Sequence, residues 1–249
     1  MLFFLLGCAP LIEAPKSFDD LTSYLYEHME HGGEELEAGV VNLDAWLEGP
    51  VRLENLESGY VVRNLRSKAI RTVVKDYDPE NEMVGVALAT DMPHPVDAVA
   101  HDMFWVESLE DKPNRRYIDD YECFLSHECD RFRYVEDVHI DFPLNISVDS
   151  SVKREARWVE HEFGEALIVR RWMVAPAVLN VDWLQVEQEL GLLIVVPTEK
   201  GLRRIEATWI LVKLGNLPVP QSLLERMGLD QVREGQENLR DRLDRDAEE

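Results

Sequence analysis

The sequence predicts an α+β domain in which an antiparallel sheet is followed by a long C-terminal helix. Three observations lead to this class. Apolar residues recur at helical spacing in the N-terminal third, strand-like segments cut by turn signals begin at Val138, and residues 221–245 form one amphipathic helix. Strands in one run with helices at the two ends of the chain are typical of α+β domains.

Composition fits a globular chain of 249 residues, of which 45% are hydrophobic and 30% charged. This excludes a disordered or collagenous protein. The 49 acidic and 26 basic residues give a net charge of −23, so a nucleic acid is not an expected partner. No stretch approaches the roughly 20 apolar residues that a membrane-spanning helix needs.

The first eight residues resemble a bacterial lipobox, in which a cysteine after a small residue is lipidated. An apolar run leads into Leu5-Leu6-Gly7-Cys8, but no basic residue precedes it and the run is shorter than the usual roughly 7–15 residues. We therefore expect either a truncated signal, with the chain begun at too late a codon, or an ordinary apolar N-terminus. The lipobox interpretation implies lipidation of Cys8, a tether over residues 9–17 and one domain over 18–249. It places the protein in the bacterial envelope. Ala9 after the cysteine favours an anchor in the outer membrane, with the protein facing the periplasm.

Cys123 and Cys129 have a spacing that suits a short disulfide loop. Two close C-x2-C pairs, which a zinc ribbon would need, are absent from the sequence. A disulfide fits an oxidising compartment and leaves Cys8 free for lipidation. Two reduced, buried thiols are the alternative.

Helices are expected first. Residues 17–20 (Ser-Phe-Asp-Asp) form a helix opening, because serine caps a helix and acids favour its positive end. Apolar spacing then predicts helices over Leu21–Met29 and Leu36–Leu47, with Gly32-Gly33 between them and Gly49-Pro50 as the stop. A shorter helix is expected over Val96–His101.

Strands follow, separated by turn residues such as Phe163-Gly164 and Thr198–Gly201. Period-two alternation makes Arg203–Leu214 a half-buried strand. One face carries Ile205, Ala207, Trp209 and Leu211, and the other carries Arg204, Glu206 and Thr208. The expected strands are Glu82–Thr90, Val138–Ser147, Lys153–His161, Ala166–Ala175, Val181–Glu189, Leu192–Val196 and Arg203–Leu214.

A proline-marked break, Leu217–Pro220, precedes the last helix, which carries an apolar stripe. Together with Glu155–Trp158, Ala166–Trp172, Gly201–Trp209 and Gly215–Pro218, this order resembles the START-like (helix-grip, polyketide-cyclase-like) superfamily. It is also similar to uncharacterised bacterial lipoproteins in which a lipobox precedes such a domain. The resemblance covers residues 117–245 and implies a curved sheet gripped by the C-terminal helix, around a space for a hydrophobic ligand. Residues 18–100 carry more helix than a minimal member would have.

Motifs for nucleotide binding, nucleophilic catalysis or zinc proteolysis are absent from the sequence. His28 and His31 lie three residues apart on an expected helix (i, i+3), but no third ligand is near in sequence, so zinc is not favoured. His161–Glu165 falls on a turn, where solvated charges are the better interpretation. The alternating acids of Asp76–Glu82 lack the glycine of a calcium loop, so a solvated acidic turn is favoured and a weak calcium site is the alternative. No metal or cofactor is expected.

Aromatic residues on the strands are the candidate ligand contacts, since rings on a curved sheet can line a cavity. A filled core is the alternative, and it is slightly favoured. Arg170 shares the layer of Trp172 by parity, so we expect it to be buried beside an acid such as Glu155 or Asp182, as a structural ion pair or as an anchor for a ligand carboxylate. The candidate ligand-binding residues are Phe132, Phe142, Trp158, Arg170, Trp172, Trp183 and Trp209.

Three functions follow from these alternatives. An envelope-anchored binding protein for a hydrophobic or lipid-like ligand, without catalysis, requires an apolar cavity. A cyclase-like enzyme requires a cavity with an Arg, His or Tyr cluster, and a structural or assembly lipoprotein requires a filled core. The binding protein is the favoured hypothesis, and no catalytic residue is assigned.

Overall fold

One antiparallel sheet organises the chain. The computed structural model describes residues 12–78, 80, 82–104, 114–142, 145–213, 215 and 220–247, with the backbone alone for 140–142. In this part of the chain the strand order is β1-β2-β9-β8-β6-β5-β4-β3, with β7 paired to β5. The strands are β1 (Tyr60–Val61), β2 (Val84–Met92), β3 (Arg115–Tyr117), β4 (Arg131–Phe142), β5 (Ile146–His161), β6 (Gly164–Met173), β7 (Val178–Leu179), β8 (Gln185–Thr198) and β9 (Gly201–Lys213).

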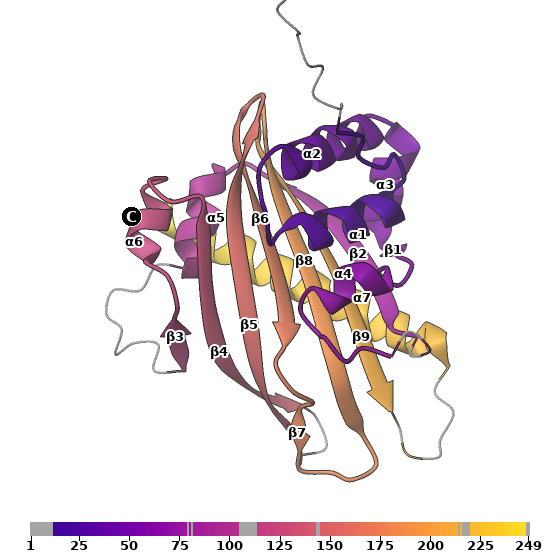
Figure 1. Ribbon diagram of the computed structural model, residues 1–249. Helices are drawn as coiled ribbons and strands as arrows, with labels where there is room; N and C mark the ends of the chain where they lie inside the picture. Colours follow the sequence, from indigo (N-terminus) through magenta and orange to yellow (C-terminus); the bar gives the residue numbers. More distant parts are fainter. Residues whose placement is uncertain are drawn as a thin grey trace, which may run out of the picture.

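Helices cover both faces of the sheet. Helices α1 to α4 lie in front of the strands in Figure 1, and the long yellow helix α7 crosses behind them with α5 and α6 beside it. Among the described residues no helix is long and apolar enough to span a membrane. The helices are α1 (Phe18–His28), α2 (Glu34–Leu47), α3 (Pro50–Ser58), α4 (Ser67–Arg71), α5 (Val96–Phe104), α6 (Tyr121–Leu125) and α7 (Gln221–Asp246).

Alternation along the strands gives the sheet two separate cores. Ile168 packs with the α1–α4 side, whereas its neighbours Leu167 and Val169 pack with α5, α6 and α7. Successive side chains on a strand point to opposite faces, so a sheet covered on both sides must be apolar on both. The expected α+β class, a sheet gripped by a C-terminal helix with extra N-terminal helices, is confirmed.

Three strand predictions were wrong in their boundaries. Val138–Ser147 is not one strand, because β4 ends at Phe142 and β5 begins at Ile146. Apolar residues at alternate positions continue across this hairpin and hide the turn. The segments Val181–Glu189 and Leu192–Val196 belong mainly to one strand, β8, which begins only at Gln185.

Gly191 explains why β8 continues where a break was expected. A Cβ at this position would lie 2.4 Å from Nε of Arg171, so the glycine lets the Arg171 side chain pass across the strand. Glycine inside a strand often marks such a close approach. The glycine is therefore a packing feature that serves Arg171.

The polar face of β9 is buried. Ile205, Ala207 and Trp209 belong to the core on the α1–α4 side, as the alternation predicts. Arg204, Glu206 and Thr208 on the other face are each only 8% exposed. The expectation of a half-buried strand is corrected here, because α7 and its neighbours cover the face that was expected to meet solvent.

Candidate functional site

A cavity of about 390 Å³ lies between α7 and the sheet. Its floor is formed by side chains of β5, β6 and β9, and its walls come from α5 and α7. The apolar part of the lining is Met103, Val232 and Leu239. The polar part is Asp102, Arg154, Arg171, Arg204, Glu206, Thr208, Gln231, Asn238 and Arg242, and Gly235 completes the lining.

Glu206 is the centre of the charged floor. Its Oε2 atom accepts a hydrogen bond from Nη2 of Arg204 at 2.6 Å, and its Oε1 atom lies 3.3 Å from Nη2 of Arg171. Burial disfavours the charged carboxylate, but Arg204, Arg171 and Arg154 outweigh burial and lower the pKa of Glu206. The carboxylate is therefore ionised and surrounded by guanidinium groups.

The other two arginines also have partners. Nη2 of Arg171 donates to Oγ1 of Thr208 at 3.2 Å and lies 3.1 Å from Glu189. Nη2 of Arg154 lies 3.0 Å from Oε2 of Glu136. These contacts hold the guanidinium groups in fixed positions over the sheet.

The mouth of the cavity lies between α5 and α7. Arg242 donates from Nε and Nη2 to both carboxylate oxygens of Asp102, at 2.7 and 2.9 Å. Such a bidentate pair fixes orientation as well as distance. Gly235 also lines the cavity, and a Cβ built there would meet no other atom within 4 Å. The glycine therefore leaves open space beside α7.

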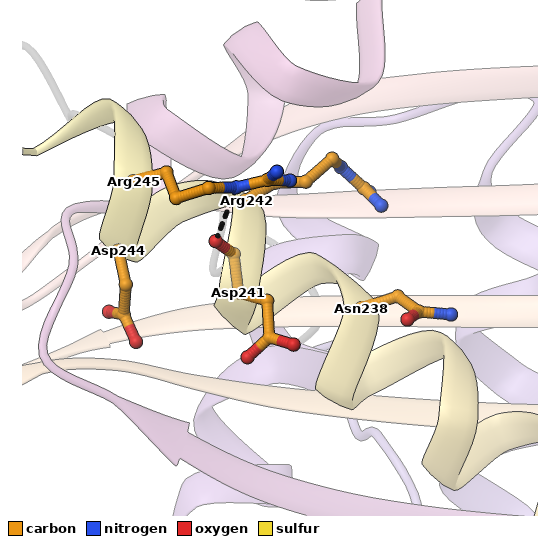
Figure 2. Close-up of a pocket in the computed structure, with 5 residues that line it drawn as sticks. All are labelled: Asn238, Asp241, Arg242, Asp244 and Arg245. Atoms are coloured by element: carbon orange, nitrogen blue, oxygen red, sulfur yellow. Dashed lines mark hydrogen bonds between the residues drawn. The ribbon is translucent and has the colours of Figure 1, made fainter.

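A second depression, of about 550 Å³, lies on the last turns of α7 (Figure 2). All five residues that line it are exposed and belong to this one helix, and Nε of Arg245 donates to the carbonyl oxygen of Asp241 at 3.1 Å. A surface formed by one helix cannot enclose a ligand. The cavity under α7, which is lined by the sheet and by two helices, is therefore the better candidate site.

The aromatic residues predicted to bind a ligand lie in two layers on opposite faces of the sheet. Phe132 and Trp158 belong to the core on the α7 side, and Trp172 and Trp209 belong to the core on the α1–α4 side. Trp183 is 49% exposed and precedes β8. None of these five residues, nor Arg170, lines the cavity under α7. The side chain of Phe142 lies outside the described residues.

Rings on the α7 side fill their layer. Phe124 stacks on Phe132 at 5.6 Å and on Trp158 at 5.2 Å between ring centroids, and Phe104 meets Phe132 edge-on at 5.4 Å. The indole nitrogen of Trp158 donates to the carbonyl oxygen of Phe124 at 2.8 Å. These are the contacts of a packed aromatic core.

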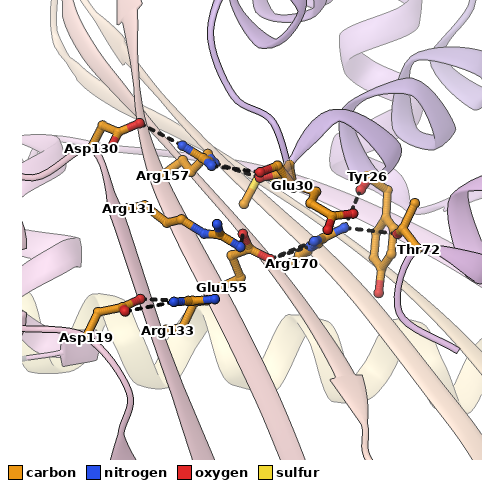
Figure 3. Close-up of polar contacts among 11 residues, drawn as sticks. Tyr26, Glu30, Thr72, Asp119, Asp130, Arg131, Arg133, Glu155, Arg157 and Arg170 are labelled. Atoms are coloured by element: carbon orange, nitrogen blue, oxygen red, sulfur yellow. Dashed lines mark hydrogen bonds and ion pairs between the residues drawn. The ribbon is translucent and has the colours of Figure 1, made fainter.

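Arg170 is buried beside Glu155, one of the two acids predicted for it (Figure 3). Its Nη1 atom donates to the carbonyl oxygen of Tyr26 at 3.1 Å and to Oγ1 of Thr72 at 3.0 Å. The pair thus joins the sheet to α1 and to the end of α4. This is the structural ion pair that the sequence favours, and it lies on the face opposite to the cavity.

Arg157 makes a second connection from the sheet to the N-terminal helices. It donates to the carbonyl oxygens of Met29 at 2.6 Å and Glu30 at 3.0 Å, and its Nη1 atom contacts Asp130 at 2.7 Å (Figure 3). Burial lowers the pKa of Arg157. The charges in this layer are therefore used to attach α1 to the sheet.

The predicted disulfide between Cys123 and Cys129 is present, with the two Cα atoms 5.4 Å apart. It closes a loop in which His127 has a positive φ of 60° and stacks on Trp158 at 4.3 Å. Cys8 and the predicted signal segment 1–8 lie outside the described residues, as do residues 9–11 of the tether. No cluster of three or more potential metal ligands occurs in the described part of the chain.

The residues around Glu206 were missed as a site. Their signal in the sequence is the run of polar residues at alternate positions of β9, which was interpreted as a solvent-facing side. A long amphipathic helix directly after that strand provides a cover for this face. The two features together could have pointed to a polar cavity.

No protein family model matches the chain, and no curated protein matches it. Among solved structures, the STAR-related lipid transfer protein from Xanthomonas axonopodis matches 74% of this chain and 92% of its own, with 13% identity and a TM-score of 0.42. Human STARD10 matches 74% of this chain and 81% of its own, with 8% identity and a TM-score of 0.38. The di-domain ARO/CYC protein StfQ of the steffimycin biosynthetic pathway matches 74% and 67%, with 11% identity and a TM-score of 0.38.

The antiparallel sheet crossed by α7 is the helix-grip arrangement that the sequence resemblance implies.

Proposed function

We propose that the protein is a non-catalytic binding module that holds a hydrophobic or lipid-like small molecule between α7 and the sheet. The observation that carries this proposal is the cavity of about 390 Å³ under α7. Its volume falls in the range of small-molecule sites, roughly 300–1,000 Å³. Met103, Val232 and Leu239 supply an apolar wall, and the charged floor supplies polar contacts.

Native mass spectrometry of the purified full chain, followed by organic extraction, tests this function. A co-purifying apolar or amphiphilic molecule, recovered chemically unchanged, is the expected result. An apo mass with no uptake from an added lipid mixture would contradict it. That outcome would favour a structural or assembly role, to which the filled aromatic layer around Phe132 is suited.

A cyclase-like enzyme is the second candidate, because arginines gather in the cavity. Against it, no His or Tyr is among the described residues that line the cavity, so a proton-transfer group of these types is missing. Recovery of a product that differs from the added ligand would favour the enzyme.

We also propose that lipidation of Cys8 anchors the domain in the bacterial envelope. The domain would be attached to the outer membrane and would face the periplasm. The disulfide between Cys123 and Cys129 supports export, because disulfides persist in oxidising compartments. With those two cysteines paired, Cys8 is the remaining cysteine of the chain.

A further inference from the structure

Four buried guanidinium nitrogens around Glu206 have no hydrogen-bond partner among the described residues. They are Nε and Nη1 of Arg204, Nε of Arg171 and Nε of Arg154. Buried polar groups are almost always paired, and each unpaired one costs free energy. All three arginines line the cavity under α7, and Arg204 is 8% exposed.

Arg204 is the least satisfied of the three. A guanidinium group carries five N–H donors, and the contact recorded for this one is from Nη2 to Glu206. Glu206 is shared with Arg171, so one carboxylate serves two cations directly. The unpaired nitrogens have almost no exposed surface of their own, so an acceptor group of a ligand reaches them only when the guanidinium groups turn toward the cavity.

Carboxylates near the cluster pair its charges without using these donors. Glu189 pairs with Arg171 through Nη2, and Glu136 pairs with Arg154 through Nη2. At the mouth, Asp102 is engaged by Arg242. The feature that points to a ligand is therefore the set of unpaired guanidinium nitrogens on arginines that line one cavity, in a chain that is otherwise strongly acidic.

We propose that the ligand held under α7 carries an oxyanion, a carboxylate or phosphate group, which accepts hydrogen bonds from Arg204 and its neighbours Arg171 and Arg154. Such a group offers several acceptor lone pairs, and guanidinium groups bind it through paired, charge-assisted hydrogen bonds. The apolar part of the ligand lies against Val232 and Leu239. This inference rests on the proposed function and names the chemical class of its ligand.

Calorimetric titration of the full chain with four probes tests the proposal. Decanoate and decyl phosphate carry the oxyanion on an alkyl chain, decanol carries the chain alone, and inorganic phosphate carries the anion alone. We expect decanoate or decyl phosphate to bind at least about ten-fold more tightly than decanol, since hydrogen bonds to charged groups are the strong ones. Arg204→Met should remove that preference, and Arg116→Met, the same change at an exposed position of β3, should leave it intact.

The outcomes distinguish failure of the oxyanion proposal from failure of the proposed binding function. Equal binding of decanol and decanoate would overturn the oxyanion proposal and leave the binding function standing. Binding of inorganic phosphate alone would support the oxyanion site and overturn the lipid-like ligand. No binding of any probe would overturn both.

The variant answers a narrower question. If Arg204→Met folds and keeps the preference for decanoate, the assignment to Arg204 is overturned. Circular dichroism checks that the variant folds. If it does not fold, the comparison of decanoate with decanol on the unaltered chain still decides the oxyanion proposal.

Discussion

Arg170 donates from both Nε and Nη2 to one oxygen of Glu155, Oε2, at 2.9 and 2.7 Å. The two residues face each other directly across β5 and β6, and each is at most 2% exposed. The second oxygen, Oε1, lies 2.5 Å from Nη2 of Arg131. One buried carboxylate therefore balances two guanidinium groups at the centre of the sheet.

Replacing Glu155 should be among the most destabilising polar changes in the chain. Glu155→Gln leaves Arg170 buried with no anionic partner, and loss of one member of a buried pair costs about 3–5 kcal/mol. Arg131→Met should cost less, because 29% of the Arg131 side chain is exposed and Arg170 still neutralises Glu155. Urea unfolding followed by tryptophan fluorescence measures both, and equal losses would contradict the central role of Glu155.

This pair shows what the sequence can reveal. Alternation along β6 places Arg170 in the layer of Trp172, and an arginine in a buried layer must meet an acid. The polar cavity could not be found in the same way, because local patterns do not say how α7 lies across the sheet. Polar residues on Arg203–Leu214 look alike whether water or a helix covers them.

The predicted strand boundaries were wrong because they depend on local features that the apolar pattern does not contain. The hairpin between β4 and β5 interrupts no apolar pattern, so the alternation around residues 138–147 looks like one strand. Trp183 was expected on a strand, but β8 begins two residues later, at Gln185, and the ring is half exposed. Cross-strand pairing decides both cases, and periodicity alone does not contain it.

Glu206 should make the protein more sensitive to acid. Its pKa is lowered from an ordinary value of 4.5 by the surrounding arginines, which outweigh its burial. A lowered pKa in the folded state contributes stability that is complete above the unfolded pKa and is lost as the pH falls through the folded pKa. The stability advantage of the unaltered chain over Glu206→Gln should therefore shrink below about pH 4.5. Urea unfolding at several pH values measures this, and a constant difference would show that the pKa is not lowered.

Removing the disulfide should lower stability by about 2 kcal/mol, the chain-entropy value for a short closed loop. The double variant Cys123→Ser and Cys129→Ser tests this by urea unfolding against the oxidised chain. Reduction of the unaltered chain should add two hydrogen atoms to its mass for this bridge. An unchanged mass after reduction would mean that the thiols are not joined.

Cys8→Ser should release the expressed protein from the membrane fraction, if Cys8 carries the lipid anchor. The double variant at Cys123 and Cys129 is the matched control, since it also exchanges cysteine for serine and should stay with the membrane. Cell fractionation followed by immunoblotting measures the distribution. Unchanged fractionation of Cys8→Ser would remove the anchor proposal and would leave the cavity untouched.

Filling the open space beside Gly235 should block ligand binding without loss of stability. Gly235 lies within α7 and lines the cavity, and no other atom lies within 4 Å of the position of a Cβ. Gly235→Leu places a branched side chain beside that space, and Gly235→Ala adds only a methyl group. Both changes should stabilise the helix by about 1 kcal/mol, because glycine is a poor helix former.

The two variants thus share the helix effect and differ in the volume added near the cavity. Uptake of decanoate should fall at least about ten-fold in Gly235→Leu, because a side chain that fills the site forfeits most of the contacts of the ligand. Uptake should stay close to that of the unaltered chain in Gly235→Ala. Calorimetric titration measures both, and thermal unfolding confirms that each variant is folded. Equal uptake by Gly235→Leu and Gly235→Ala would show that the ligand does not occupy the space beside Gly235.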